Sequence, residues 1–285
     1  HDSGARAILI LENFAHTLAE VQHDVHLDTV IVTGVGDLLG FPKSLLVNFA
    51  LRHVKKQVPE YSLPGAVSLI EALSKGRYEN LERVELGHED IAFLQYTGGT
   101  TGVSKGAMLT HRNVLANMEQ TGAWVSLIFA EGAEIAIAPL PLYHIFCLTA
   151  TLSFMKWGSL NVLITNPRDL PGLVKELGQW RWTIMTGVNT LFNGLLHAPG
   201  FDRLDFSSVK AVIGGGAAVQ QSVAERWRQV TGCSITEGYG LTEASPVACA
   251  NPIGTPWNGT IGIPYPSTEL TIRDAVFAEL PPWTG

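Results

Sequence analysis

The sequence predicts an α/β protein with mostly parallel sheets flanked by helices. Short apolar segments rich in β-branched residues alternate with amphipathic stretches of helical length. This alternation is typical of parallel strands joined by helical crossovers. The chain has 285 residues, of which 46% are hydrophobic and 16% charged. That composition is typical of globular proteins and excludes disordered, collagen-like and coiled-coil chains.

The expected elements follow the chain in order. The predicted strands are 6–11, 29–33, 91–96, 135–138, 160–164, 183–185, 209–213, 234–239 and 269–273. The predicted helices are 14–21, 112–129, 170–180, 188–197 and 220–231. A charged helical stretch between Pro42 and Gly87 contains two further prolines and indicates a peripheral excursion. Because prolines punctuate the chain after Asn251, we expect a main domain over 1–250 and the beginning of a small β subdomain over 251–285.

Charge and cysteine content exclude several classes of protein. With 26 acidic and 19 basic residues the net charge is −7, so the chain lacks the basic field that drives nucleic-acid binding. Three cysteines without a CxxC pair predict neither a disulfide framework nor a zinc site, and they fit a reducing cytoplasm. The uncharged stretch 135–155 contains Pro139 and Pro141, which favours a buried segment over a membrane span. The start at His1, without a signal-peptide pattern, predicts a piece of a longer chain.

A glycine- and threonine-rich loop follows the predicted strand 91–96. Glycines let backbone N–H groups turn toward an anion, the hydroxyls donate hydrogen bonds, and Lys105 adds positive charge. The spacing fits neither the Walker A loop nor GxGxxG. We interpret the loop as a phosphate cradle, with a plain flexible turn as the alternative. Its residues are Tyr96, Thr97, Gly98, Gly99, Thr100, Thr101, Gly102 and Lys105.

Two further motifs follow predicted strands, at the sheet edge where ligands usually bind. In 237–243, Tyr239 could stack on a base beside Gly240, Thr242 could donate to a phosphate, and Glu243 is a suitable Mg²⁺ ligand. A solvated turn at a strand end explains this motif equally well. The other motif is Gly214, Gly215, Gly216 and Ala217, whose missing side chains would let a flat ligand lie against the backbone or a helix pack closely.

A fourth motif is the apolar run 139–146, whose one titratable side chain is His144. A lone histidine in such a run is more often a hydrogen-bonded core residue than a catalytic base. Its position after a predicted strand keeps it a candidate site residue.

These motifs together resemble the adenylate-forming superfamily. YTGGTTGVSKGAMLTH, PLPLYHIF, GGGAAV, EGYGLTE and NGTIGIPYPSTEL occur in the family's order and approximate spacing. Flanking phrases such as LQYTGGTTG, ITNPRDLPGLVKEL and LDFSSVK are similar to bacterial long-chain fatty-acid–CoA ligases of the FadD type. The likeness runs from His1 to about Ile272 and covers about half of a full-length member.

The resemblance implies a role for each motif. The loop from Thr97 to Lys105 would hold the β- and γ-phosphates of ATP, Thr242 the α-phosphate, and Glu243 the Mg²⁺ ion. Gly214 to Ala217 would face the adenine, and Tyr239 would pack on its plane. His144 would shape or gate the site near the acyl carboxylate. Plausible lining of the acyl tunnel is Tyr143, Phe146, Val188 and Phe192.

The resemblance also implies the activity of the parent protein, in which ATP, CoA and a long-chain fatty acid give acyl-CoA through an acyl-adenylate. The expected partners are then these small molecules and no nucleic acid. We expect no transmembrane segment, whereas a homodimer and peripheral contact with the inner membrane are both compatible with the resemblance. Because the ribose-binding aspartate, the C-terminal lysine and the lid domain of the family are absent from the sequence, we expect a central fragment that is inactive alone. The alternatives are a noncatalytic nucleotide- or lipid-binding module and an adenylating enzyme for another carboxylic acid.

Overall fold

The chain forms two compact units, residues 1–85 and 86–285, of which the computed structural model describes residues 2–98 and 104–280. The first unit is built on a parallel sheet in the order β1-β2-β3. Its strands are β1 (Ala7–Leu11), β2 (Thr29–Thr33) and β3 (Val67–Ser68). Its helices are α1 (Ala15–Val21), α2 (Lys43–Phe49) and α3 (Leu69–Gly76), with a π-helical turn, Ala50–Val54, continuing α2. The predicted strands 6–11 and 29–33 and the helix 14–21 are confirmed.

The second unit contains a seven-stranded sheet in the order β12-β11-β10-β9-β8-β6-β7. Its strands are β6 (Ile135–Ala138), β7 (Leu160–Leu163), β8 (Ile184–Gly187), β9 (Ala211–Gly214), β10 (Ile235–Gly240), β11 (Val247–Ala250) and β12 (Ile263–Pro264). All pairs from β7 to β10 are parallel, whereas β11 and β12 join antiparallel. The predicted fold class is therefore confirmed, and the five predicted strands from 135 to 239 are confirmed with small differences in their ends.

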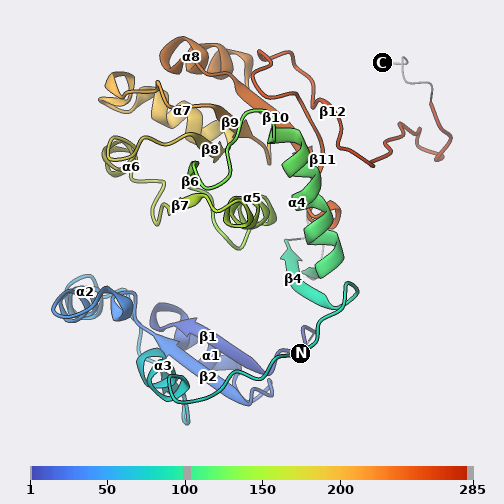
Figure 1. Ribbon diagram of the computed structural model, residues 1–285. Coiled ribbons are helices and arrows are strands. Elements are labelled where there is room, and N and C mark those ends of the chain that lie inside the picture. The colour runs from blue at the N-terminus through green and yellow to red at the C-terminus, as the bar shows by residue number, and fades with distance from the viewer. Residues whose placement is uncertain (1, 99–103, 281–285) are drawn as a thin grey trace. The chain divides into compact units, whose positions relative to one another are not determined.

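Helices cover both faces of this sheet (Figure 1). They are α4 (His111–Val125), α5 (Ile145–Lys156), α6 (Leu170–Leu177), α7 (Asn189–His197) and α8 (Gln221–Thr231). Consecutive strand residues point to opposite faces, so Ile137 and Met185 join the core formed with α6, α7 and α8. Their neighbours Ala136 and Ile184 pack with Phe154 of α5 on the other face. The sheet is thus buried on both sides, as its apolar strands predict.

A separate antiparallel hairpin precedes α4. It consists of β4 (Ile91–Thr97) and β5 (Lys105–Thr110), with Thr97 opposite Lys105. Thr110 caps α4: its hydroxyl accepts from the N–H of Asn113 at 3.2 Å, and the Asn113 amide oxygen accepts from the N–H of Thr110 at 3.1 Å. This reciprocal cap fixes where the hairpin ends and the helix begins.

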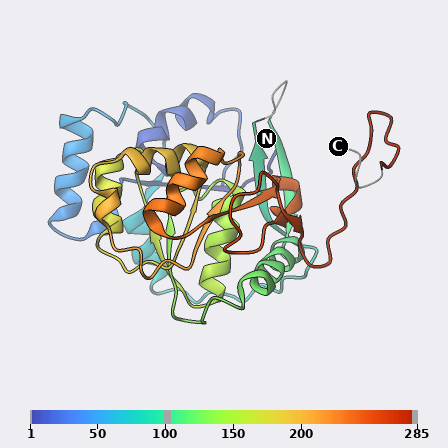
Figure 2. The same ribbon diagram turned by 90° about the horizontal axis from the view of Figure 1, so that it is seen from above.

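The prediction of a strand over 269–273 is wrong. This segment forms only an isolated bridge between Arg273 and Glu279, and Figure 2 shows it extending away from the sheet. A strand needs a partner for its N–H and C=O groups, and the described part of the chain offers none beyond that bridge. A β subdomain over 251–285 stays a prediction. The boundary between the two compact units near residue 85 was not predicted.

None of the described helices is both long enough and apolar enough to cross a bilayer. The uncharged stretch 135–155 contains β6 and most of α5 instead. Six side chains of α5 are buried. The interpretation of 135–155 as a buried segment therefore holds for most of β6 and α5, whereas residues 141–144 between them are exposed.

Candidate functional site

A cavity of about 350 Å³ lies at the carboxyl edge of the seven-stranded sheet. It brings together residues of all four predicted motifs, although they are far apart in the sequence. Its lining is Thr97, His144, Ile145, Phe146, Ile213, Gly214, Gly215, Gly216, Gly238, Tyr239, Gly240, Leu241, Thr242, Glu243, Pro246, Val247, Ala250 and Tyr265. The convergence follows from the topology, because parallel strands end at one edge of their sheet.

Glycines form one wall of the cavity after β9. A methyl group at Gly215 would come within 3.2 Å of the Phe146 ring, and one at Gly214 within 2.9 Å of Ile235 and Val219. Gly216 has a φ of +75°, a conformation that side-chain-bearing residues rarely adopt. Gly214 therefore allows close packing against the core and Gly215 lies against the Phe146 ring, while this part of the lining carries no side chains of its own.

Another part of the lining comes from the end of β10 and the turn that follows it. Tyr239 is 47% exposed, so its ring is available to a ligand. Thr242 and Glu243 lie on a 3₁₀ turn, Thr242–Ala244, which is closed by the N–H of Leu241 donating to the carbonyl of Pro246 at 3.0 Å. Gly240 passes so close to Pro246 that no side chain fits there.

Asn117 of α4 holds the far end of this turn. The side chain is 2% exposed, and its Nδ2 donates to the carbonyl of Val247 at 2.8 Å while its Oδ1 accepts from the N–H of Val247 at 3.2 Å. One amide therefore satisfies both backbone groups of Val247, as a neighbouring strand would. Since α4 follows directly from β5, Asn117 links the hairpin to the turn that carries Glu243.

The predicted phosphate loop joins β4 to β5. Thr97 lines the cavity, and its carbonyl accepts from the Ser104 hydroxyl at 3.0 Å. Tyr96 packs its ring on Gly106, while Lys105 begins β5 and is exposed. Gly98 is the last residue described before the gap. The predicted ligands Gly99, Thr100, Thr101 and Gly102 lie outside the described residues. Here the loop runs from strand to strand, unlike the strand-to-helix loop of a Walker A motif.

His144 is the N-cap residue of α5. Its Nδ1 accepts from the N–H of Phe146 at 3.3 Å, so the ring proton of the neutral side chain is on Nε2. The ring lines the cavity, and its orientation is fixed by its own helix. The arrangement suits a residue that shapes the site.

The four residues predicted for the acyl tunnel lie in different surroundings. Phe146 lines the cavity, and Val188 lies close to Gly216. Tyr143 is 80% exposed, whereas Phe192 is fully buried and packs edge to face on Trp227 with a centroid distance of 5.0 Å. The tunnel itself stays a prediction.

Tyr265 is a cavity residue that the motif analysis did not single out. It is 6% exposed, and its ring lies 5.1 Å from that of Trp124. Burial raises the pKa of the Tyr265 hydroxyl to about 12, so it stays protonated at neutral pH. The signal that could have found it is the phrase NGTIGIPYPSTEL, which contains it.

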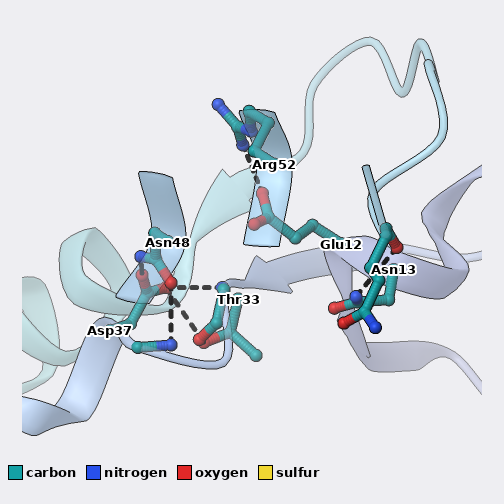
Figure 3. A network of polar contacts seen from close by, with 9 residues as sticks. Glu12, Asn13, Thr33, Asp37, Asn48 and Arg52 are labelled. Carbon is teal, nitrogen blue, oxygen red and sulfur yellow. Dashed lines mark hydrogen bonds and ion pairs between the residues drawn. The ribbon is translucent and has the colours of Figure 1, made fainter. Parts of the chain in front are cut away.

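A larger cleft of about 750 Å³ lies in the first unit. Several of its polar groups pair with one another (Figure 3). Asp37 accepts from Asn48 at 2.7 Å and from Thr33 at 3.0 Å, and the Arg52 guanidinium pairs with Glu12. The hydrogen bond and the charge of Glu12 raise the pKa of Arg52. Because these contacts brace the unit and no predicted motif reaches the cleft, the cavity at the sheet edge is the better candidate.

Comparison with known proteins identifies the arrangement. The chain matches the AMP-binding enzyme family over residues 1–285. It belongs to that family. A long-chain-fatty-acid–CoA ligase of Escherichia coli O6:H1 is 52% identical over 284 residues, which are 99% of this chain and 51% of the relative. The ligase of Bacillus subtilis strain 168 is 38% identical over 258 residues, 89% of this chain and 45% of its own length. The chain thus spans about half the length of the curated relatives it matches.

Solved structures of AMP-binding enzymes share the fold. An anthranilate–CoA ligase in complex with anthranoyl-AMP superposes with a TM-score of 0.78 at 21% identity, over 97% of this chain and 48% of that one. A long-chain-fatty-acid–CoA ligase of Archaeoglobus fulgidus gives 0.71 at 20% identity, over 98% and 52%. The expected superfamily and fold are therefore confirmed. The roles of individual site residues stay predictions.

The predicted Mg²⁺ site at Glu243 stays a prediction. Among the described residues no group of three or more histidine, cysteine and carboxylate side chains could hold a metal. Glu243 is exposed, and within the described part of the chain no hydrogen bond or ion pair occupies its carboxylate. A single free carboxylate suits Mg²⁺, which proteins commonly bind through one or two carboxylates together with substrate phosphates.

Proposed function

We propose that the complete protein containing this chain activates a long-chain fatty acid with ATP and transfers it to CoA. One observation carries the proposal: a single cavity gathers the glycine wall, Tyr239, the Thr242–Glu243 turn and the base of the phosphate loop. The substrate class is supported by the names of the relatives at 52% identity, which are long-chain-fatty-acid–CoA ligases.

The reaction has two steps. A carboxylate oxygen attacks the α-phosphorus, and the bond to the bridging oxygen of the β-phosphate breaks, which releases pyrophosphate and leaves an acyl-adenylate. The CoA thiol, losing its proton, then attacks the acyl carbon, and AMP departs with the bonding electrons. The products are acyl-CoA, AMP and pyrophosphate.

The chain's own residues would bind and orient the nucleotide. The adenine would lie between the backbone of Gly214 to Ala217 and the ring of Tyr239. Thr242 would donate to the α-phosphate, and Thr97 and Lys105 would meet the charge that grows on the departing pyrophosphate. A Mg²⁺ ion bound through Glu243 would neutralise phosphate charge during the first step. His144 would border the acyl carboxylate, with the acyl chain beyond Phe146.

Acids of different classes test the substrate assignment. Pyrophosphate release by the complete protein is measured with ATP, Mg²⁺ and palmitate, octanoate or benzoate. Release that is fastest with palmitate supports the proposal. Fastest release with benzoate would favour an aryl-acid ligase, a second candidate because benzoate– and anthranilate–CoA ligases share this fold. A protein that binds ATP without releasing pyrophosphate would be a noncatalytic binding module.

Replacing Lys105 by alanine should weaken adenylation. One charge-assisted hydrogen bond is worth about 1.5 to 3 kcal/mol, so we expect kcat/KM for ATP to fall roughly ten- to a hundredfold. Steady-state pyrophosphate release measures this, with Lys175→Ala on the surface of α6 as the control. Unchanged kcat and KM for ATP would make Lys105 a surface residue and the loop a plain turn.

We also propose a cytoplasmic location and peripheral contact with a membrane, since the substrate is poorly soluble. Lys43 begins the helical segment from α2 to Val54 and Lys55 and Lys56 follow it, and exposed apolar side chains such as Leu46 and Phe49 lie on the same segment. Binding to anionic and neutral lipid vesicles, with and without charge reversal of these lysines, tests this contact. Sedimentation of the complete protein tests whether it is a homodimer.

A further inference from the structure

The backbone that follows the glycine wall, at Val219 and Gln220, is held by side chains of other elements. The N–H of Val219 donates to Oε1 of Glu237 at 2.8 Å, and the carbonyl of Val219 accepts from the indole Nε1–H of Trp257 at 2.9 Å. The following N–H, of Gln220, donates to Oδ1 of Asn189 at 3.0 Å. Val219 is 3% exposed, so its backbone groups depend on these partners.

Trp257 belongs to the segment between β11 and β12, which is itself firmly tied. Asn251 is 6% exposed, its Nδ2 donates to the carbonyl of Thr260 at 2.8 Å, and its Oδ1 accepts from Asn258 at 3.0 Å. The Trp257 ring packs against the main core and borders, with Tyr239, a hollow beside residues 216–219. The indole therefore reaches Val219 from a braced position.

A wall of consecutive glycines needs such bracing. Gly214 is paired in the sheet with β8 and β10, and the N–H of Gly215 donates to the carbonyl of Gly187 at 3.2 Å. Gly216, which has no side chain and a φ of +75°, lies beyond these sheet contacts, and glycine loses the most conformational freedom on ordering. If this backbone were disordered before binding, a flat base would have to order it, and the entropy cost of that ordering would reduce the favourable free energy of binding. Contacts that order the wall beforehand raise affinity for the base without touching it.

We propose that Trp257, together with Asn189, is a positioning residue that holds the glycine wall at the spacing from Tyr239 that an adenine ring requires. The inference rests on the proposed function, in which this wall faces the adenine. The inference predicts that loss of the Trp257 contact weakens the binding of ligands that carry adenine. Pyrophosphate binding should not change, because pyrophosphate would bind at the loop between β4 and β5.

The test replaces Trp257 by phenylalanine in the complete protein. This change keeps an aromatic ring and removes the indole N–H. Trp180→Phe is the matched control, because the indole of Trp180 donates to Oε1 of Glu176 at 3.0 Å, away from the cavity. Calorimetry measures the affinity for AMP and for pyrophosphate, and steady-state assays measure the KM for ATP and kcat.

We expect Trp257→Phe to weaken AMP binding and raise the KM for ATP by the same factor, about three- to thirtyfold. Pyrophosphate affinity and kcat at saturating ATP should stay within about twofold of wild type, and Trp180→Phe should change none of these values. Equal weakening of AMP and pyrophosphate would indicate general loosening and overturn the inference. So would AMP affinity indistinguishable from that of the control.

Asn189 provides a second pair of variants if Trp257→Phe does not fold. Asn189→Ala removes the acceptor for the N–H of Gln220, whereas Asn189→Asp keeps an oxygen there. We expect the alanine variant to lose AMP affinity selectively and the aspartate variant to stay near wild type. Identical behaviour of the two would overturn the inference. If the wild-type protein binds AMP but releases no pyrophosphate with any acid, the proposed function is refuted. The AMP affinities of the variants would still test whether Trp257 and Asn189 position the glycine wall.

Discussion

Replacing Glu243 by glutamine should nearly abolish adenylation while leaving the fold intact. The side chain is exposed, and no described residue pairs with it, so its loss removes no structural contact. A neutral amide is a much poorer Mg²⁺ ligand than a carboxylate. Losing even an indirect metal contact typically costs about 10- to 100-fold in activity, so we expect kcat/KM for ATP to fall by at least about a hundredfold.

The measurement is pyrophosphate release by the complete protein over a series of Mg²⁺ concentrations. Raising Mg²⁺ should recover part of the activity of Glu243→Gln, because a weakened ligand can be offset by concentration. Glu225→Gln, at an exposed position of α8, is the control and should behave as wild type. Release near the wild-type rate at low Mg²⁺ would remove Glu243 from the metal assignment.

The sequence predicts the carboxyl edge of the sheet well. Gly214 and Tyr239 lie at the carboxyl ends of β9 and β10, and His144 comes after β6; parallel strands necessarily bring such residues to one edge. The strands themselves are recognisable because both faces are buried, which makes them continuous apolar runs.

Elements without a distinct local pattern were not predicted. Helix α5 is apolar on all sides and lies between β6 and β7, so its residues show no helical period. Strands β5 and β11 are defined by their antiparallel partners, β4 and β10, rather than by their own composition. The segment 269–273 is the opposite case: a strand was predicted from its residues, but the described part of the chain pairs with it only through one bridge.

Polar contacts between residues far apart in the chain could not be predicted from a single sequence either. Asn117 and Val247 lie 130 positions apart, and Trp257 and Val219 lie 38 apart. Nothing in the residues around them distinguishes these side chains from other polar or aromatic ones. The residues that touch a ligand can thus be predicted from motifs, whereas the residues that hold those motifs in place require the structure.

Replacing Lys210 by methionine should be the most destabilising single change among the charged residues discussed. Glu134, Thr183 and Lys210 directly precede β6, β8 and β9, at the edge of the sheet opposite the cavity. Lys210 Nζ lies 2.5 Å from Oε1 of Glu134, which also accepts from the N–H of Ala130 at 2.8 Å. The Glu134 side chain is 1% exposed, so the variant would leave a buried carboxylate without its cation.

Breaking a fully buried pair costs about 3 to 5 kcal/mol. Because 38% of the Lys210 side chain is exposed, water can partly replace it, and we expect about 2 to 4 kcal/mol. This corresponds to a fall in melting temperature of at least about 3 °C for a chain of this length. The matched control is Lys156→Met: Lys156 is 39% exposed and pairs with Glu119 at 2.9 Å, but Glu119 is 66% exposed. The control should cost less than about 1 kcal/mol.

The pH dependence separates a buried charge from a simple loss of packing. Burial alone would raise the pKa of Glu134, but hydrogen bonds from Lys210, Thr183 and Ala130 outweigh it, and the pKa is lowered in the folded protein. The stability from this group is therefore present above the ordinary glutamate pKa of about 4.3 and is lost as the pH falls through the folded value. In Lys210→Met the hydrogen bonds from Thr183 and Ala130 remain, but the cation and its hydrogen bond are lost, so the pKa of Glu134 should rise and the variant should lose most stability at neutral pH. The difference in melting temperature between wild type and variant should narrow from pH 7 toward pH 4, and a difference that is constant over this range would contradict the ionic account.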